Sequence, residues 1–262
     1  MQTEERQARL AEYLQQVEFA SLEELAQHVD VSVSTVRRDL TALEEGGTIR
    51  RTHGGARVVQ PRTDEFVFRM RDTRQVDEKE AIGKVCADLV QPNQSVILDA
   101  GTTVYHAARR LGDKKPHILT NSLPVANLFS SSSLVEVVVS GGIVYPRLGV
   151  LVGPLTVSAF SEMDADLAIM GGSGVTEQGI YNTHALLIDI QRAMIKAARK
   201  VVFCLDHTKF GRKSMSHICG LEEIDCVVTD KRAPADLLDV IRGKGVEVIL
   251  APDASRETAA ST

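Results

Sequence analysis

The sequence contains no tryptophan, few aromatic residues and no long apolar run. Aromatic side chains make up 4% of the 262 residues, although the hydrophobic fraction of 44% is ordinary for a globular protein. No apolar stretch approaches the roughly 20 residues of a membrane-spanning helix, and the charged N-terminus is unlike a secretory signal peptide. We therefore expect a cytoplasmic protein of one or two domains that does not enter a membrane.

Cysteine is also scarce. The four thiols are Cys86, Cys204, Cys219 and Cys226, and no pair has the two-residue spacing of a zinc-binding motif. Three of them lie in apolar runs and are interpreted as small buried side chains, and free thiols suit a reducing compartment. The sequence predicts neither a metal site nor a cofactor.

An excess of positive charge is absent as well, since the formal net charge is −5. This balance excludes a protein covered with basic residues. It does not exclude a confined basic face, because only the contact surface has to match the phosphates of DNA. The first 58 residues contain a candidate for such a face.

Residues 1–58 are predicted to form a separate module that begins with three helices. Ser21 and Glu24 have the spacing of a capping box before the second helix. Ser32 is a suitable N-cap for the third helix, and Gly46 and Gly47 end it. The predicted helices span residues 3–16, 22–28 and 33–45.

The third helix has two chemically different sides. At about 100° per residue, Val36, Leu40 and Leu43 form one apolar stripe. Arginine can bind guanine through two hydrogen bonds, and Ser and Thr suit phosphates or base edges, so the polar side resembles a recognition helix. Asp39 is expected to pair with a nearby arginine, because phosphate would repel it. The polar side and its flank comprise Ser34, Arg37, Arg38 and Thr41.

A basic wing is predicted after the third helix. Residues 48–52 alternate like a short strand, and residues 53–57 turn and return. The two features together predict a winged helix-turn-helix; the alternative is an ordinary helical module with a solvated arginine pair. The predicted DNA-binding residues are Ser32, Ser34, Thr35, Arg37, Arg38, Thr41, Arg50, Arg51, His53, Gly54 and Arg57.

Two motifs of this module resemble a known family. Ser-x-Ser-Thr-Val-Arg-Arg-Asp-Leu from Ser32 and His-Gly-Gly-Ala from His53 are similar to the DeoR family of bacterial sugar-responsive repressors, over residues 6–56. Family members often have proline where this chain has Val33, but proline is not required at a first helical position. The resemblance implies binding to an operator in double-stranded DNA.

The rest of the chain predicts a larger α/β domain. Residues 59–75 are interpreted as a linker, residues 76–252 as the domain and residues 253–262 as a disordered tail. Alternating strands and helices favour a doubly wound, mostly parallel sheet with helices on both faces. The predicted strands are 96–99, 117–120, 135–140, 167–170, 201–205, 226–229 and 246–250. The predicted helices include 76–89, 104–111, 123–129, 155–162, 186–198 and 234–242.

Small and polar residues follow several of these strands. Ligands of such sheets bind at the carboxyl ends of the strands, where glycine permits close approach and a helix N-terminus favours an anion. Each motif alone is compatible with a plain turn, but together they predict a pocket for a phosphorylated sugar or polyol. The predicted pocket residues are Asp99, Gly101, Thr102, Thr103, Asn121, Gly141, Gly142, Gly172, Ser173, Gly174 and Lys209.

The same family resemblance extends through residues 78–230. Asp-x-Gly-Thr-Thr from Asp99, Thr-Asn-Ser-Leu-Pro-Val-Ala-Asn from Thr120 and Asp-His-Thr-Lys-Phe-Gly from Asp206 are similar to the family's effector domain. The resemblance implies a fold similar to ribose-5-phosphate isomerase. It also implies sugar-phosphate sensing by Asp99, Gly101, Thr102, Thr103, Asn121 and Lys209.

One departure from the family pattern concerns the pocket. Where the family usually has an acidic residue and, four positions on, a lysine, this chain has Leu187 and Gln191. Either the ligand preference differs, or the apolar segment 185–190 forms a subunit interface. The sequence leaves both possibilities open.

Three functions follow from these patterns. The first is a sequence-specific transcriptional regulator, a repressor of carbohydrate genes, which acts as a dimer or tetramer and responds to a phosphorylated sugar. The second is an isomerase-like enzyme with a DNA-binding module, using Asp99, Asp206 and Lys209, although no further carboxylate completes a proton shuttle. The third is a DNA-binding scaffold without a ligand. We expect the first.

Overall fold

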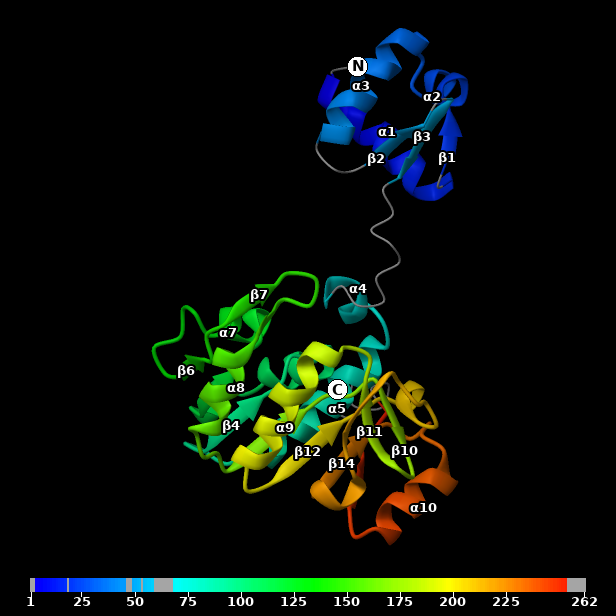
Figure 1. Ribbon diagram of the computed structural model, residues 1–262. Helices are drawn as coiled ribbons and strands as arrows, with labels where there is room; N and C mark the ends of the chain where they lie inside the picture. Colours follow the sequence, from blue (N-terminus) through cyan, green and yellow to red (C-terminus); the bar gives the residue numbers. More distant parts are fainter. Residues whose placement is uncertain (1–2, 18, 46–48, 53, 59–67, 254–262) are drawn as a thin grey trace, which may run out of the picture. The chain divides into compact units, whose positions relative to one another are not determined.

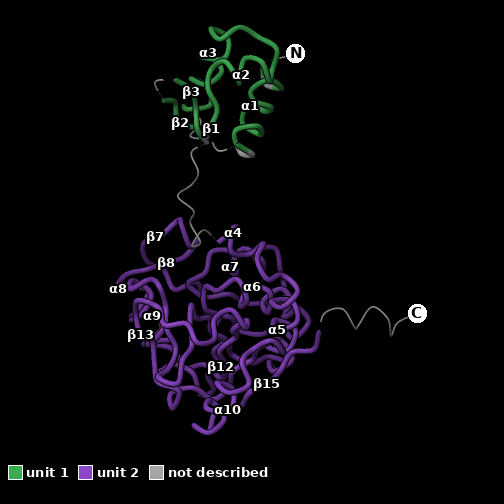
Figure 2. The backbone as a smooth tube through the Cα atoms, turned by 90° about the vertical axis from the view of Figure 1, so that its right-hand side faces the viewer, with its two compact units in different colours: residues 1–65 green, residues 66–262 purple. Residues whose placement is uncertain are grey.

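The computed structural model describes residues 3–17, 19–45, 49–52, 54–58 and 68–253. The chain divides into two compact units, Met1–Glu65 and Phe66–Thr262 (Figure 2). Several predicted features lie outside the described residues: the helix end at Gly46 and Gly47, the DNA contact His53, residues 59–67 of the linker and residues 254–262 of the tail.

The first unit combines three helices with a three-stranded antiparallel sheet of order β1-β3-β2. The helices are α1 (Thr3–Val17), α2 (Leu22–His28) and α3 (Val33–Glu45), and the strands are β1 (Phe19–Ser21), β2 (Ile49–Thr52) and β3 (Gly55–Val58). All three helices lie where the sequence predicted them. Strand β1 was not predicted, because three residues are too few to show an alternating pattern.

Local signals and burial explain the helices of this unit. The Ser21–Glu24 capping box is confirmed, with Glu24 N donating to Ser21 Oγ over 3.2 Å and Ser21 N to Glu24 Oε2 over 2.8 Å. In α3, Val36 and Leu40 are fully buried and Leu43 is partly buried, which confirms the apolar stripe. This stripe orients the helix, so its polar side faces outward.

A seven-stranded sheet forms the centre of the second unit (Figure 1). Its order is β15-β14-β12-β9-β4-β5-β6, and every neighbouring pair is parallel. All seven strands were predicted, and their bounds are β4 (Ser95–Leu98), β5 (His117–Thr120), β6 (Glu136–Val139), β9 (Leu167–Met170), β12 (Val201–Cys204), β14 (Cys226–Thr229) and β15 (Glu247–Leu250).

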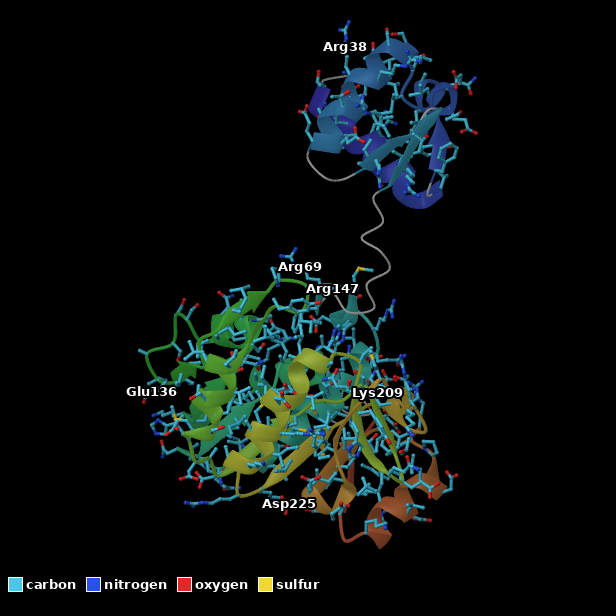
Figure 3. All side chains as sticks on the ribbon, viewed as in Figure 1. Arg38, Arg69, Glu136, Arg147, Lys209 and Asp225 are labelled. Atoms are coloured by element: carbon cyan, nitrogen blue, oxygen red, sulfur yellow. The ribbon has the colours of Figure 1, made fainter. Side chains whose placement is uncertain are left out.

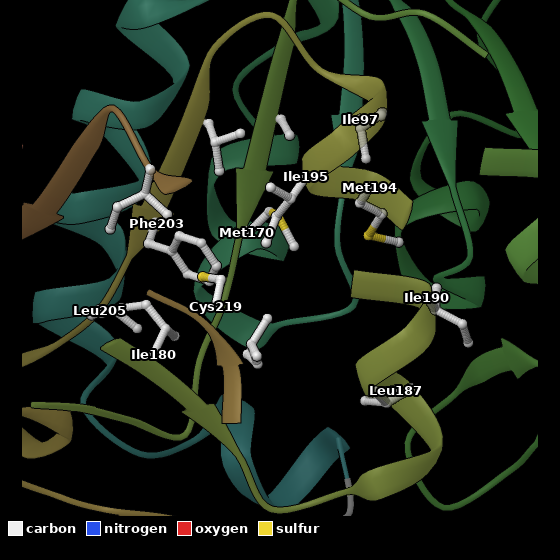
Figure 4. Packing of buried hydrophobic residues seen from close by; sticks show 14 of the residues in the cluster. Ile97, Met170, Ile180, Leu187, Ile190, Met194, Ile195, Phe203, Leu205 and Cys219 are labelled. Carbon is white, nitrogen blue, oxygen red and sulfur yellow. The ribbon is translucent and has the colours of Figure 1, made fainter. Parts of the chain in front are cut away.

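Helices cover both faces of this sheet, as the sequence predicted. Val96 and Leu98 of β4 pack on one face with α5 (Val76–Leu89), α6 (Thr102–Ala108) and α7 (Leu123–Leu128). Ile97, between them, points to the opposite core, in agreement with the two-residue period of a strand. Figure 4 shows part of this opposite core. It is covered by α8 (Pro154–Ser161), α9 (Ile188–Ala197) and α10 (Ala235–Gly243).

Shorter elements at the edges of the second unit were not predicted. A hairpin of β7 (Ile143–Tyr145) and β8 (Val150–Val152) follows β6. A second sheet, of order β10-β11-β13, is antiparallel. Its strands are β10 (Gly174–Thr176), β11 (Gly179–Asn182) and β13 (Ser216–Cys219), and four 3-10 turns are η1 (Gly112–Lys114), η2 (Ala185–Leu187), η3 (His207–Lys209) and η4 (Leu221–Glu223).

Residues 68–72, which the sequence placed in the linker, instead form helix α4 (Phe68–Asp72). A five-residue helix is too short to show an apolar period, so tertiary contacts define it. The Phe68 ring packs edge-on against Tyr105, with 5.3 Å between ring centroids. Among the helices of the described ranges, none has the length and apolar character to span a membrane.

Candidate functional site

The polar side of α3 carries exposed basic side chains. Ser34, Arg37 and Arg38 are exposed, and Arg38 projects away from the rest of its unit (Figure 3). Their placement follows from the burial of Val36 and Leu40 on the other side of the helix. The exposed side can therefore enter a groove of DNA without unpacking the core.

A cluster of hydroxyl groups lies at the start of α3. Ser32 Oγ is 2.9 Å from Ser34 Oγ and 3.0 Å from Thr35 Oγ1, and it accepts a hydrogen bond from Thr35 N over 3.4 Å. Ser32 therefore caps the helix, as predicted. Hydroxyl donors at a helix N-terminus suit contact with a phosphate.

Arg51 of the wing is tied to α3. Its Nε is 2.7 Å from Glu44 Oε2, and its Nη1 donates to Thr41 Oγ1 over 2.8 Å. Thr41 Oγ1 in turn donates to the Arg37 carbonyl over 2.9 Å. These bonds give Thr41 and Arg51 a positioning role, because they fix the wing against the helix. Their predicted DNA contacts stay predictions.

The other basic residues of the wing face each other. Arg50 and Arg57 are direct cross-strand partners of β2 and β3, and both are exposed. Like charges in that position repel, so an anion between them would be stabilising. Gly54 is exposed at the turn. A groove of about 410 Å³ between α3 and the wing is lined by Leu22, Arg37, Leu40, Glu44, Arg51, Thr52 and Gly55.

Asp39 pairs with an arginine, as predicted. Its carboxylate is 4% exposed and accepts from Arg6 Nε over 2.6 Å and from Arg6 Nη2 over 3.1 Å. The hydrogen bond to Asp39 raises the pKa of Arg6. This pair joins α1 to α3 and keeps the only acidic residue in the middle of α3 turned away from the exposed side.

The second candidate site lies at the carboxyl ends of three adjacent strands, β12, β9 and β4. Asp99 follows β4, and its Oδ2 accepts from Gly171 N, which follows β9, over 3.1 Å. Its Oδ1 accepts from Ala100 N over 2.7 Å. Burial raises the pKa of Asp99, although these hydrogen bonds oppose the shift. The structure thus joins two of the predicted strand-end motifs.

Gln191 extends this group. Its Nε2 donates to Asp99 Oδ2 over 2.7 Å and to the Gly171 carbonyl over 3.1 Å, and its Oε1 accepts from Asn182 Nδ2 over 2.9 Å. Ser173 Oγ donates to Asn182 Oδ1 over 3.4 Å. Asn182 was not among the predicted pocket residues, because it belongs to the unpredicted strand β11. Gln191 is 1% exposed, so its amide is an integral part of the site.

The segment before Gln191 packs mainly inside its own unit. Leu187 is 7% exposed and belongs to the same core as Ile188 and Ile190, whereas Leu186 is 61% exposed. The apolar character of residues 185–190 is therefore explained largely by the core. Of the two positions at which the chain departs from the family pattern, only Gln191 bonds to the site.

Cationic side chains lie around Asp206, which follows β12. Lys209 Nζ is 3.5 Å from Asp206 Oδ2. Burial tends to raise the pKa of Asp206, but Lys209 and the hydrogen bonds from Thr208 outweigh it and hold that pKa low. Lys79 of α5 is 4% exposed and donates from Nζ to the Arg71 carbonyl. Burial lowers the pKa of Lys79 to about 8, while Asp206 opposes this shift.

Sequence reasoning missed Lys79. A single lysine within a helix carries no signal by itself. Its role becomes visible only once the fold brings α5 beside the end of β12.

Some of the remaining predicted pocket residues lie in the first turn of α6 or just after β9. Thr102 and Thr103 are buried in the first turn of α6, and a Cβ on Gly101 would lie 3.6 Å from Gly171 Cα, so this turn adjoins Asp99. Gly172 and Gly174 are closely packed: added Cβ atoms would lie 2.9 Å from Ile180 Cγ2 and 2.0 Å from the Arg212 carbonyl oxygen.

Asn121, Gly141 and Gly142 lie further along the sheet. Asn121 is fully buried and donates from Nδ2 to the Leu151 carbonyl over 3.0 Å, which ties β5 to the hairpin. The Gly141 carbonyl accepts a hydrogen bond from Thr156 Oγ1 over 2.7 Å. A Cβ added to Gly142 would clash with the same Thr156 Oγ1. Within the described residues no hydrogen bond joins these three to Asp99.

Two family models match the chain. The DeoR-like helix-turn-helix domain matches residues 6–62, and the DeoR C terminal sensor domain matches residues 74–231. Together they account for both units.

Individual proteins are similar to this chain over almost its whole length. The HTH-type transcriptional regulator GolR of Listeria innocua is 35% identical, covering 94% of this chain and 98% of its own. The Glycerol-3-phosphate regulon repressor of Escherichia coli is 31% identical, and the match covers 95% of this chain and 100% of that protein.

Among solved structures, ribose 5-phosphate isomerase A of Methanocaldococcus jannaschii is 17% identical, with a TM-score of 0.38, over 52% of this chain and 54% of that chain. The fold assignment rests on the strand order of the sheet itself. The full-length relatives are regulators of transcription, so the alternative of an isomerase-like enzyme is set aside. The chain belongs to the DeoR family of transcriptional regulators, with an N-terminal helix-turn-helix domain and a C-terminal sensor domain.

Proposed function

We propose that this regulator represses carbohydrate genes in the cytoplasm and that a phosphorylated sugar or polyol at the ends of β4, β9 and β12 changes its affinity for the operator. The observation that carries the proposal is the buried acid and amide at these strand ends together with the partly exposed Lys209 beside Asp206. Such an arrangement suits a ligand with hydroxyl groups at one end and a phosphate at the other.

The polar half of the site suits hydroxyl groups. Asp99 accepts hydrogen bonds and Gln191 both donates and accepts them, so a polyol can satisfy both. Because Gln191 is neutral, no cation bonds directly to Asp99 within the described residues. A second phosphate at this end would therefore be repelled, which favours monophosphates.

The cationic half suits the phosphate. Lys209 Nζ is 3.5 Å from Asp206 Oδ2, and the charges of Lys79 and Asp206 act on each other's pKa. A relative 31% identical to this chain is named a Glycerol-3-phosphate regulon repressor, which supports the ligand class. The proposed contacts are Asp99, Gly101, Thr102, Thr103, Asn121, Ser173 and Lys209, with Lys79 and Gln191 added.

A thermal-shift panel tests this proposal. It compares glycerol 3-phosphate, glucose 6-phosphate, fructose 1-phosphate and ribose 5-phosphate with their unphosphorylated counterparts. A ligand at 100 times its Kd stabilises the folded state by about 2.7 kcal/mol, so one phosphorylated member should raise Tm by several degrees. Lys209→Gln should remove that rise. No rise with any member would favour the ligand-free scaffold.

The DNA-binding residues are proposed on the basis of exposure. Ser34, Arg37 and Arg38 of α3 are the base-reading candidates, and Ser32, Thr35, Arg50 and Arg57 are the phosphate candidates. Thr41 and Arg51 act through the geometry of the wing. Residues 59–67 would serve as the linker between the two units.

We further propose a homo-oligomer, because operators with two half-sites are bound by paired recognition helices. An exposed apolar surface on the second unit is the candidate interface. It involves the edge strand β6, strand β7 and the start of α8, and includes Val138, Val139, Ile143, Val144 and Leu155. Ile143 is 69% and Leu155 63% exposed, which is costly for an isolated chain.

A further inference from the structure

His106 is a buried histidine of α6 that has a carboxylate at each ring nitrogen. Its side chain is 4% exposed, and its Nε2 lies 3.1 Å from Asp72 Oδ1 of α4. Its Nδ1 lies 2.9 Å from Glu80 Oε1 of α5. The histidine therefore bridges three helices, and neither of the two candidate sites includes it.

The hydrogen bonds of this cluster require a charged ring. A carboxylate only accepts hydrogen bonds, and a neutral imidazole has one N–H donor and one acceptor nitrogen. With a neutral ring, one of the two contacts would set a lone pair against an anion. An imidazolium has an N–H at both nitrogens and can donate to both acids. The positions of the two carboxylates therefore favour the protonated form of His106.

The neighbouring arginines of α6 keep Glu80 ionised. Arg110 Nη2 is 2.7 Å from Glu80 Oε2, and Arg109 Nη1 is 3.0 Å from Glu80 Oε1. Burial tends to raise the pKa of Glu80, but the hydrogen bonds from Arg110 and His106 and the charges of His106 and Arg109 outweigh it and hold that pKa low. Glu80 therefore stays an acceptor, and the proton belongs on the ring.

Asp72 lies at the edge of the cluster, where its side chain is 33% exposed. It also interacts with Lys79 of α5: burial lowers the pKa of Lys79, and the charge of Asp72 is one of those that oppose this shift. The Tyr105 ring lies 6.3 Å from the His106 ring. The charged groups that act on the cluster are thus Asp72 on α4, Lys79 and Glu80 on α5, and Arg109 and Arg110 on α6.

The histidine is fixed more firmly than its partner on α4. A Cβ added to Gly83 of α5 would lie 2.8 Å from the carbonyl carbon of His106 and 2.8 Å from Ala107 N. Helix α5 therefore packs directly against the backbone of His106 and holds it beside Glu80. The movable side of the cluster is α4.

Helix α4 is held on the second unit by few contacts. None of its five residues is buried. Besides the pair of Asp72 and His106, its contacts include the ring packing of Phe68 on Tyr105, the hydrogen bond from Phe68 N to the Arg147 carbonyl over 3.4 Å and the bond from Lys79 Nζ to the Arg71 carbonyl. Segments with few buried contacts open at a small cost in free energy, so the loss of one charged contact should matter for this helix.

We propose that Asp72, His106 and Glu80 form a pH-sensitive latch, in which protonated His106 holds α4 on the second unit and loss of the proton releases it. Histidine changes charge between about pH 5 and pH 8. The docked helix is therefore favoured at the acidic end of this range and is lost toward the basic end.

Release of α4 would add residues 68–75 to the stretch of chain between the two units. At about 3.3 Å per extended residue, this would lengthen the stretch by up to about 25 Å. The latch would thus make the reach of the DNA-binding unit depend on pH. This inference holds whether or not the sensor domain binds a phosphorylated ligand.

Hydrogen exchange followed by mass spectrometry on the full-length protein tests the latch. Peptides that cover residues 68–75 are compared at about pH 5.5 and about pH 7.5, after correction for the intrinsic exchange rate at each pH. The range ends below pH 8, because Lys79 also contacts α4 and its pKa, lowered by burial, is about 8. We expect protection of residues 68–75 to fall roughly tenfold, since one proton changes an equilibrium by up to about tenfold per pH unit. A peptide from β9 should keep its protection.

Two substitutions remove the need for a charged ring. His106→Gln places a group that does not titrate at this position, and Asp72→Asn supplies an amide that can donate to the acceptor nitrogen of a neutral imidazole. Protection in either variant should be nearly equal at the two pH values. Because Asp72 is partly exposed, Asp72→Asn also covers the case in which substitution of the buried histidine prevents folding. His117→Gln is the matched control, since His117 Nδ1 lies 3.3 Å from Glu136 Oε2 in an exposed pair of β5 and β6.

Three outcomes would overturn the inference. The first is equal protection of residues 68–75 at both pH values in the wild-type protein. The second is a fall that persists in a folded His106→Gln or Asp72→Asn protein, which would assign the titration to another group. The third is a fall that disappears in His117→Gln, because a change on the surface of β5 would then have the effect expected of the latch.

Discussion

At the residue scale, different side chains of α3 carry the proposed reading of DNA and the stability of the fold. Arg38 is exposed and makes no contact that the helix needs, whereas Asp39, its neighbour, is buried and paired with Arg6. Adjacent positions on a helix point about 100° apart, so consecutive residues can have unrelated roles. The two can therefore be tested separately.

Arg38→Ala should weaken specific operator binding about 5- to 150-fold, because a bidentate contact to a base contributes about 1–3 kcal/mol of discrimination. A gel shift with specific and scrambled DNA measures the loss, and circular dichroism checks that the fold is unchanged. Arg242→Ala, on the exposed side of α10, is the control. Unchanged specificity in the Arg38 variant would remove this residue from the reading face.

Lys79 gives the pocket a dependence on pH. In the unfolded chain this lysine has a pKa near 10.5, and in the folded protein its pKa is about 8, so the unfolded chain binds more protons between these values. The free energy of unfolding contributed by Lys79 therefore rises with pH across that window. The affinity of the pocket for a phosphate should change in the opposite direction. It should fall as the pH rises through about 8, because Lys79 then loses its positive charge.

Calorimetric titration of glycerol 3-phosphate from pH 7 to pH 9.5 measures this fall. The phosphate is already a dianion throughout, so the change belongs to the protein. Asp206, Arg71, Lys209 and Asp72 all act on the pKa of Lys79. A Lys79→Met variant should bind more weakly at pH 7 and show a flatter profile; an equally steep profile would assign the titration to another group.

At the element scale, the contact between α3 and the wing decides how the DNA-binding surface is shaped. Glu44 holds both the backbone and the side chain of Arg51. Glu44→Ala should therefore lower operator affinity roughly fivefold, since about 1 kcal/mol of hydrogen bonding is lost. Fluorescence anisotropy with labelled operator measures the change.

The control for this experiment is Glu45→Ala. Glu45 is an exposed neighbour, and its removal changes the net charge by the same amount. Because losing an acid near DNA favours binding, the control should bind as well as wild type or better. Similar losses in both variants would show that the Arg51 contact is unimportant.

Elements differ in how well the sequence predicted them. The seven strands of the parallel sheet were found because each is a short run of mainly apolar residues, and the central ones are buried throughout, such as Val201–Cys204. Helix α4 and strand β1 were missed because five and three residues are too few for a period to appear. Likewise, Asp99 was visible at a strand end, whereas Lys79 and Asn182 join the candidate site only through tertiary packing.

At the scale of the whole molecule, the exposed apolar residues of β6, β7 and α8 bear on assembly. Ile143→Asp should shift the protein toward its monomer mass of 28.5 kDa in sedimentation experiments, because a charge would be buried at the proposed interface. Met215→Asp is the control, since Met215 is 84% exposed in the loop before β13. A wild-type protein that already sediments as a monomer would exclude the proposed homo-oligomer.

The facing arginines of the wing, Arg50 and Arg57, bear on the behaviour of the protein away from its operator. The two guanidinium groups repel until an anion lies between them. Sulfate or nucleic acid of any sequence would thus stiffen the same hairpin. Before any base is read, the wing would thus already favour polyanions over other surfaces, and this unspecific attraction would let the protein search along DNA by sliding.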